Sequence, residues 1–154
     1  MTRVAPAEKP VPHLSAGELL AWRGLLETEA RLLRRLDEEL RARRSMSLSE
    51  FDVLYQLWIA PERRTRMKSL AAAVLVTPGG VTRLVSRLEE RGWVRRTGER
   101  GVQAVVAELT TTGSRALERA MDVHFAGVKR DFVSRLSRAE VGRMSDLWRR
   151  LGAS

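Results

Sequence analysis

Three short segments of the chain share one pattern: an apolar residue, then Ser, then Glu three residues later, then another apolar residue. They are "LSAGEL" at 14–19, "MSLSEF" at 46–51 and "LSRAEV" at 136–141. This pattern is typical of a capping box with a hydrophobic staple, in which the serine oxygen and the glutamate satisfy free backbone N–H groups at a helix start. It predicts helices that begin at Ser15, Ser47 and Ser137.

Apolar residues recur at steps of three and four after the first two starts, which is the period of a helix with one buried face. The first helix carries Leu19, Trp22, Leu26, Leu33, Leu36 and Leu40. This stripe is longer than one small core needs, so it is expected to pack against another helix. The second helix covers about 48–60, ends before Pro61, and directs inward Phe51, Leu54, Leu57 and Trp58.

The middle of the chain predicts further short elements. A basic turn, "PERRTR", covers 61–66, and a short helix covers 68–74 with Leu70, Ala73 and Val74 inward. The next helix runs from 77 to about 91 with Val81, Leu84, Val85 and Leu88 inward, and Gly92 stops it. Two β-branched stretches, 93–97 and 102–109, indicate a hairpin with glycine at its tip.

Two helices close the chain, and Thr110 or Thr111 caps the first of them. That helix carries Leu117, Met121, His124, Phe125, Val128, Phe132 and Leu136, and the helix from Ser137 carries Val141, Met144, Trp148 and Leu151. The fold class is therefore mainly α with a small β wing, a winged helix-turn-helix flanked by long dimerisation helices.

The expected organisation is a flexible arm at 1–13 and a single domain at 14–154. Within the domain, 46–110 forms the winged helix-turn-helix lobe, and 14–44 and 111–154 form the dimerisation helices. The flanking helices have more apolar surface than the small lobe can cover, so a two-fold symmetric homodimer is expected.

Composition limits the chemistry of the chain. It has no cysteine, which excludes disulfides, thiolate metal sites and cysteine nucleophiles. Only His13 and His124 could supply imidazole, so neither a metal nor a cofactor is expected.

No stretch approaches the ~18 apolar residues of a membrane span, and a cytoplasmic location is expected. The formal charge of +9 indicates a polyanionic partner, although a GC-rich genome would also favour arginine.

The stretch "TPGG" opens the helix at 77–91. A nucleotide-binding loop would need the spacing GxxxxGK(S/T) after a strand, whereas this stretch follows a helix and lacks the lysine. Thr77 instead suits an N-cap and Pro78 the first helical position. Gly79 and Gly80 have no Cβ, so the helix N-terminus and its free N–H groups can approach a partner closely.

The outward positions of this helix are Thr82, Arg83, Ser86 and Arg87, with Arg91 behind them, and Arg95, Arg96 and Arg100 extend the basic surface onto the hairpin. Between 77 and 103 there are six arginines and three acidic residues, so the charge is concentrated there. Arginine can read guanine with two hydrogen bonds, and hydroxyl groups can reach bases or phosphates. A solvated helix face would also carry arginines, but the uncharged first turn and the arginine hairpin together favour a surface that reads DNA.

Two segments carry a resemblance to a known family, "TPGGVTRLVSRLEERGWVRR" at 77–96 and "LTTTG" at 109–113. Together with their surroundings, over about 15–152, they resemble the MarR family of bacterial winged helix-turn-helix regulators. The resemblance implies a homodimer held by the first and last helices, with the 77–91 helix in the major groove and the wing at the minor groove. It also implies release from DNA by a small ligand.

The chain departs from the family pattern at two places. Relatives carry Asp-x-Arg near the wing tip, whereas the shorter "RRTGERGVQAV" at 95–105 has Gly101, Val102 and Gln103 there, with Arg100 as the substitute. This wing is therefore expected to contact phosphates. Lys68 stands where relatives place a Ser N-cap, and a lysine there could bind a phosphate.

The tryptophans and His124 are considered both for core packing and for binding of a small ligand. Trp22, Trp58, Trp93 and Trp148 each fit an apolar face or a strand start, and core packing is their expected role. Because relatives bind their effector between the dimer helices and the DNA-binding lobe, the resemblance makes Trp22 and Trp58 the ligand-binding candidates. His124 lies in an apolar stripe and is expected to be a core or interface histidine with its hydrogen bonds satisfied.

The sequence thus favours a sequence-specific DNA-binding transcriptional regulator, a ligand-responsive repressor that binds a palindromic operator as a homodimer. The candidate contacts to double-stranded DNA are Lys68, Thr77, Pro78, Gly79, Gly80, Thr82, Arg83, Ser86, Arg87, Arg96 and Arg100. The alternatives are a winged-helix module for a protein partner and a non-specific nucleoid-associated protein. An enzyme is not expected, because no carboxylate pair, nucleophile with a base or cofactor motif is present.

Overall fold

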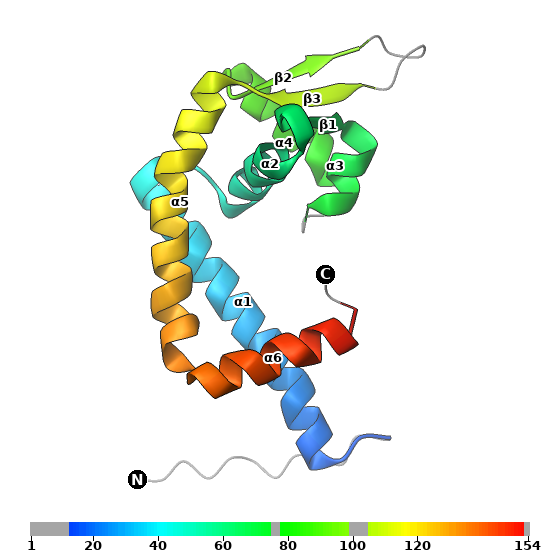
Figure 1. Cartoon of the computed structure of the whole chain (residues 1–154), viewed down its shortest axis with the longest axis vertical. Coiled ribbons are helices and arrows are strands. Elements are labelled where there is room, and N and C mark those ends of the chain that lie inside the picture. The colour runs from blue at the N-terminus through cyan, green and yellow to red at the C-terminus, as the bar shows by residue number, and fades with distance from the viewer. Residues whose placement is uncertain (1–12, 75–77, 99–104, 153–154) are drawn as a thin grey trace.

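The computed structural model describes residues 13–74, 78–98 and 105–152, and most of them are helical (Figure 1). The helices are α1 (Ala16–Arg44), α2 (Leu48–Ile59), α3 (Met67–Ala73), α4 (Pro78–Glu90), α5 (Thr111–Asp131) and α6 (Arg138–Arg150). The strands are β1 (Arg64–Arg66), β2 (Val94–Thr97) and β3 (Val106–Leu109), and 3₁₀ turns cover Pro61–Arg63 and Val133–Arg135. The predicted fold class, mainly α with a small β wing, is confirmed.

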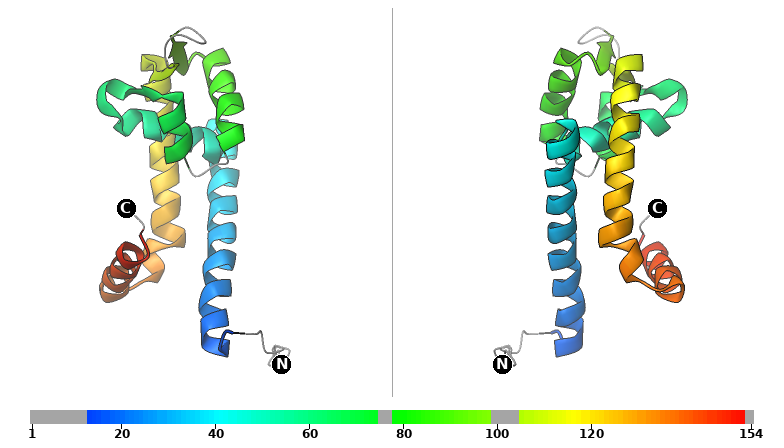
Figure 2. Two further views of the ribbon diagram at one scale, coloured as in Figure 1. Left: turned by 90° about the vertical axis from the view of Figure 1, so that its right-hand side faces the viewer. Right: turned by 90° about the vertical axis from the view of Figure 1, so that its left-hand side faces the viewer.

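The elements are arranged as a lobe and two long legs. α2, α3, α4 and the sheet form the lobe, and α1 and α5 extend from it side by side (Figure 1). Figure 2 shows both legs from the side, with α6 projecting away from the far end of α5. Arg130 of α5 joins the legs through an ion pair with Glu39 of α1 at 2.7 Å.

The three predicted capping boxes are all present. Ser15, Ser47 and Ser137 each accept a hydrogen bond from the N–H of the third helical residue, at 3.3, 3.1 and 3.3 Å. In each box the glutamate accepts from the N–H of the serine at 2.7 Å. Thr110 caps α5 by accepting from the N–H of Gly113 at 3.0 Å. The starts of these four helices therefore agree with the sequence prediction.

The core of the lobe lies where α2, α4 and α5 meet. The predicted inward residues of α4 are all buried, and they are Val81, Leu84, Val85 and Leu88. They belong to one cluster with residues of α2 and α5 that include Phe51, Val53, Leu54, Leu57, Leu117 and Ala120. Gly92 follows α4 with a φ of 70°, the left-handed conformation expected of a glycine that ends a helix.

The sheet is antiparallel with the strand order β1–β3–β2. The predicted hairpin is confirmed over β2 and β3, with Val94 opposite Leu109. The prediction of a basic turn at 61–66 is right for Pro61–Arg63, which forms a 3₁₀ turn, and wrong for Arg64–Arg66, which forms β1 and pairs with β3. Only Thr65 of these three residues is partly covered, so the strand is too short and too polar to be distinguished from a turn by its sequence.

Two residues that were predicted to face inward are exposed. Trp58 follows the buried Leu57 at the edge of the apolar stripe of α2, and 37% of its surface is exposed. Ala73 is exposed because α3 ends there and the extended Val74 (φ −75°, ψ 146°) turns into the core in its place.

The helix that was predicted to continue to Leu136 is shorter. α5 ends at Asp131, because Phe132 has a non-helical backbone (φ −124°, ψ −69°). The 3₁₀ turn at Val133–Arg135 then leads into α6. This break lets α6 leave the line of α5 and project from it (Figure 2).

Much of the apolar surface of α1 and α6 is uncovered in the described part of the chain. α1 buries Leu36 and Leu40 but exposes Leu20, Trp22, Leu25, Leu26 and Leu33, whereas α6 buries no residue and exposes Val141 and Leu147. Apolar patches of this kind mark interfaces in soluble proteins. Across the described ranges, no helix combines the length and apolar character that crossing a membrane requires.

Replacing Gly113 with alanine is expected to lower the free energy of unfolding by about 1–3 kcal/mol. Gly113 is buried in the first turn of α5, where a Cβ would overlap with the carbonyl oxygen of Trp93. That oxygen also accepts a hydrogen bond from the N–H of Thr110 at 3.0 Å, so it cannot move away without loosening the junction. Urea unfolding followed by circular dichroism measures the loss.

The matched control is Gly142→Ala in α6. A Cβ at Gly142 would meet nothing within 4 Å, so this variant should be as stable as the wild type or up to about 1 kcal/mol more stable. Equal destabilisation by the two substitutions would contradict the close contact at Gly113.

Candidate DNA-binding surface

The helix that was predicted to read DNA is α4, and it begins at Pro78. Proline suits the first helical position, because its missing N–H would have no partner there and its φ is already helical. The predicted N-cap, Thr77, lies outside the described residues, and so does Arg100 at the wing tip. Gly79 and the half-buried Gly80 lie in the first turn of α4, as the sequence indicates.

Burial of the apolar face of α4 determines which residues point away from the lobe. A helix turns every 3.6 residues, so the positions opposite the buried stripe face outward. Thr82, Arg83 and Arg87 are exposed, and Ser86 is half-buried. The structure therefore brings together on one outer face the four residues that the sequence predicts for base contacts.

Basic residues of the lobe differ in whether they have a carboxylate partner. Arg64, Arg95 and Arg96 have the carboxylate partners Glu62, Glu108 and Glu89. Arg66, Lys68, Arg83 and Arg87 are exposed and have no ion pair with any residue in the described ranges. Uncompensated positive charge therefore lies on the outer face of α4 and at the start of α3, where a polyanion can bind without displacing a carboxylate.

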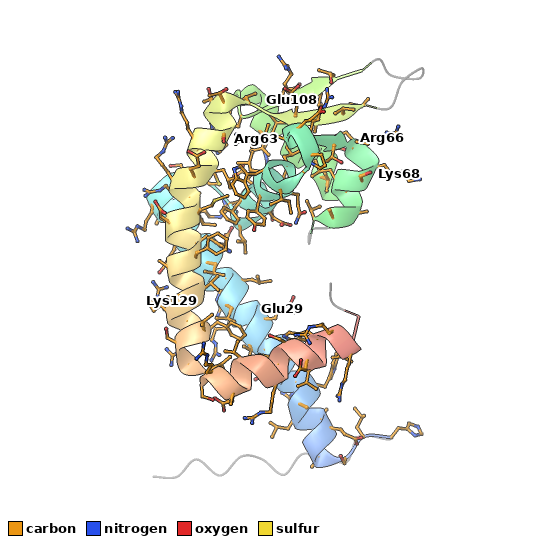
Figure 3. The ribbon with its side chains drawn as sticks, viewed as in Figure 1. Glu29, Arg63, Arg66, Lys68, Glu108 and Lys129 are labelled. Atoms are coloured by element: carbon orange, nitrogen blue, oxygen red, sulfur yellow. The ribbon has the colours of Figure 1, made fainter. Side chains whose placement is uncertain are left out.

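Arg66 is a candidate that the sequence analysis does not identify. Figure 3 shows Arg66 and Lys68 extending away from the outer side of α3. Arg66 is the last residue of β1 and precedes α3, so the pairing of β1 with β3 positions it next to Lys68. The only signal in the sequence is the basic run at 63–68, which a turn explains equally well.

Arg96, a predicted DNA contact, is held between β2 and α4. Its Nε donates a hydrogen bond to Glu89 at 2.8 Å, and its backbone N–H donates to the other carboxylate oxygen at 3.0 Å. These hydrogen bonds, the side-chain one first, hold the pKa of Glu89 below its ordinary value, although partial burial opposes them. Glu89 is therefore ionised at neutral pH, and it neutralises Arg96 while fixing the wing against the helix.

An open groove of about 450 Å³ separates α4 from the wing. Its lining residues are Met67, Thr82, Glu89, Arg96, Gly98 and Val105. Thr82 therefore lies on the side of α4 that faces the wing. A partner that contacts both the outer face of α4 and the hairpin has to span this groove.

The tryptophans are less buried than predicted. Trp22 is 55% exposed and Trp58 is 37% exposed, so core packing is the wrong prediction for both. Trp93 and Trp148 are half-buried. Trp22 lies in the N-terminal half of α1 and Trp58 at the end of α2, and no ring contact joins these two ligand candidates in the described structure.

Trp58 belongs to a row of aromatic side chains between α2 and α5, which we call the aromatic row: Phe51, Tyr55, Trp58, His124 and Phe125. The ring centroids are 6.1 Å apart for Tyr55 and Trp58, 6.0 Å for Phe51 and Tyr55, and 4.3 Å for Phe51 and His124. The sequence alone does not predict this row, because its members come from two separate helices.

The prediction that His124 has its hydrogen bonds satisfied is wrong for one ring nitrogen. Nδ1 of His124 is buried and has no hydrogen-bond partner among the described residues. Burial lowers the pKa of His124, with the charge of Asp52 acting in the opposite direction, so the ring is neutral at pH 7.

Comparison with known proteins places this fold in one family. The sequence model of the MarR family matches residues 45–103, which include α2, α3, α4 and β2. The chain is 34% identical over 91 residues to an uncharacterised HTH-type transcriptional regulator of Bacillus cereus. It spans 59% of the length of that curated relative.

Solved structures extend the similarity to nearly the whole chain. Sco3205, a MarR family transcriptional regulator from Streptomyces coelicolor crystallised in complex with DNA, is 30% identical, with a TM-score of 0.81 and 90% of each chain covered. AbsC, another MarR family regulator from Streptomyces coelicolor, has a TM-score of 0.82 at 24% identity, with 92% of this chain and 95% of AbsC covered. These relatives are transcriptional regulators and not enzymes. The chain therefore belongs to the MarR family of winged helix-turn-helix transcriptional regulators.

Proposed function

We propose that the protein is a sequence-specific DNA-binding repressor that binds a palindromic operator as a homodimer and responds to a small-molecule effector. The observation that carries the DNA-binding part is the uncompensated positive charge on the outer face of α4 and the start of α3. Sco3205, which is similar over nearly the whole chain, was crystallised with DNA, and this supports the same kind of partner here.

In this proposal α4 is the recognition helix and lies in the major groove. Arg83 and Arg87 donate to guanine or phosphate, and the hydroxyl groups of Thr82 and Ser86 reach neighbouring groups. Pro78, Gly79 and Gly80 carry no polar side chain, so the first turn approaches the DNA through its backbone N–H groups.

Phosphate contacts hold the lobe in register on the duplex. Lys68 and Arg66 bind the backbone beside the major groove, because both are exposed and neither has a carboxylate partner among the described residues. The wing contributes through Arg100, while Arg96 acts mainly by holding the wing in place through Glu89.

A second copy of the chain covers the apolar surface of α1 and α6 in the proposed homodimer. The exposed leucines of α1 and the absence of any buried residue in α6 support this arrangement within the described structure. Two-fold symmetry would place two copies of α4 on one face of the duplex, with half-sites centred about one helical turn, ~34 Å, apart.

The effector is proposed to bind at the aromatic row. Trp58 and Phe125 are partly exposed there, and Nδ1 of His124 has a free hydrogen-bonding position in the described structure. A flat molecule with one polar group could stack on the rings and satisfy Nδ1. Trp22, the other candidate, lies on the stripe of α1 that the second copy would cover.

Two alternatives use the same basic surface differently. A nucleoid-associated protein would bind all duplexes with nearly equal affinity, and a protein-interaction module would bind an acidic partner and no duplex. The exposed hydroxyl and arginine side chains on α4 favour the sequence-specific function, because both groups form directional hydrogen bonds with base edges.

Arg83→Ala and Arg87→Ala are each expected to weaken binding to the selected duplex by about 1–3 kcal/mol. Each should also lower the slope of log K against log salt by about 1 if the arginine contacts a phosphate. Fluorescence anisotropy titrations at several salt concentrations measure both quantities. Lys129→Ala is the control, because Lys129 is also an exposed cation but lies on α5, far from the lobe (Figure 3). Equal losses in Arg83→Ala and Lys129→Ala would contradict the assignment of α4.

The proposed homodimer predicts a mass of about 35 kDa by light scattering, twice the 17.4 kDa of one chain. Leu147→Glu is expected to shift the mass toward the monomer, because it places a charge on the apolar face of α6. Ile59→Glu is the control, since Ile59 is 53% exposed at the end of α2, outside the proposed interface. A monomeric wild type at micromolar concentration would rule out the dimer.

The effector site is tested by screening small aromatic carboxylates and phenols for release of bound DNA. Trp58→Ala is expected to raise the half-effective concentration of an active compound at least tenfold, because a stacking surface is lost. Ile59→Ala removes a neighbouring exposed side chain and should leave it unchanged. An active compound that is insensitive to Trp58→Ala would show that it binds elsewhere.

A further inference from the structure

Arg91 is the residue that follows α4, and the sequence analysis places it behind the DNA-facing arginines. In the structure its guanidinium turns back toward the protein. Cζ lies 3.5 Å from the centroid of the Trp93 ring, and Nη1 donates a hydrogen bond to the carbonyl oxygen of Ser45 at 2.9 Å. Nη1 is also 3.8 Å from a carboxylate oxygen of Glu50.

Two partners of Arg91, Ser45 and Glu50, lie at the corner between α1 and α2. Ser45 is the C-cap of α1, with a left-handed φ of 51°, and its N–H donates to the carbonyl oxygen of Arg41 at 3.1 Å. The C-terminal end of a helix carries partial negative charge, so it attracts a cation. Glu50 is buried in the capping box of α2, where it accepts from the N–H of Ser47 at 2.7 Å. The last turn of α1 also carries Arg41, Arg43 and Arg44, so the corner is not negative as a whole. It offers Arg91 one carbonyl acceptor and one carboxylate, both held in place by capping hydrogen bonds.

These contacts make Arg91 a link between three elements. It joins the end of α4, the start of the wing at Trp93, and the end of α1. One third of its side chain (33%) remains exposed, but part of its hydrogen-bonding capacity is used at the end of α1. Arg87, one helical turn earlier, is exposed and has no ion pair in the described structure.

We propose that Arg91 is a positioning residue that sets the orientation of α4 relative to α1, and does not contact DNA. The inference rests on the proposed function, in which α1 belongs to the dimer interface and α4 reads DNA. The angle between these two helices then determines the spacing of the two recognition helices in the dimer. Arg91 thereby sets the preference for paired half-sites at one spacing, and contributes little to the general attraction to phosphates.

The two roles have different signatures in DNA binding. Loss of a phosphate contact weakens binding to every duplex and lowers the salt slope by about 1. Loss of a positioning contact weakens binding to the paired operator, reduces the difference between correctly and incorrectly spaced half-sites, and leaves the salt slope unchanged.

The test compares Arg91→Met with the matched variant Arg87→Met on three duplexes: the selected operator, the operator with two base pairs inserted between its half-sites, and a random sequence. Methionine keeps an unbranched apolar side chain for packing and removes the charge and all donors. Arg91→Met should bind the operator about tenfold more weakly, discriminate less against the insertion, and keep the wild-type salt slope and random-sequence affinity. Arg87→Met should lower the slope and weaken binding to all three duplexes.

Two further measurements distinguish the loss of a positioning contact from a folding defect. Circular dichroism must show that Arg91→Met is folded at the assay temperature, and Arg91→Lys, which keeps a charge and a donor that can reach Ser45, should recover part of the operator affinity. Hydrogen exchange without DNA should be faster in Arg91→Met at residues 45–50 and 88–94.

The outcomes separate the inference from the proposed function. A reduced salt slope with parallel losses on all duplexes would make Arg91 a phosphate contact and overturn the inference. Unchanged operator binding by a folded Arg91→Met would overturn it as well. If the wild type prefers no duplex, the proposed function fails. The link between α4 and the α1–α2 corner is then tested by hydrogen exchange alone, and exchange rates that are the same in Arg91→Met and the wild type would reject it.

Discussion

Burial of one apolar face of α4 is the constraint on which the rest of the candidate site depends. Val81, Leu84, Val85 and Leu88 lie in the core, and burying one such side chain contributes about 1.5–3 kcal/mol. Rotating α4 about its axis would expose several of them together, so the helix has one stable orientation. That orientation places Arg83 and Arg87 on the outer face. The core of the lobe thus determines which side chains a DNA duplex can meet.

The arginines of this chain have two different roles, and their partners distinguish them. Arg96 and Arg91 are held by Glu89 and by the carbonyl oxygen of Ser45, and they join the wing and the α1–α2 corner to α4. Arg83 and Arg87 have no ion pair in the described ranges and are free for a ligand. The net positive charge of the chain therefore overstates the charge that is available for binding, and the distribution of carboxylates decides where that charge lies.

Local features of the structure could be predicted from the sequence, and tertiary ones could not. Capping boxes use residues within one turn, so Ser15, Ser47 and Ser137 mark their helix starts without ambiguity. β1 exists because a distant strand supplies its partners, and "RTR" alone contains no trace of that pairing. The contacts of Arg91 and Arg96 were missed for a related reason: helical periodicity assigns a residue to a face, but it does not say whether a neighbouring element reaches that face.

We propose that α4 presents a base-reading surface, in a dimer, to a palindromic site. Selection of binding sites by the wild-type protein from a pool of random duplexes tests it most directly. We expect enrichment of one inverted repeat whose half-site centres lie about one helical turn, ~10–10.5 base pairs, apart. A pool that remains random after several rounds, although the protein retains bound duplex, would contradict sequence-specific reading by α4.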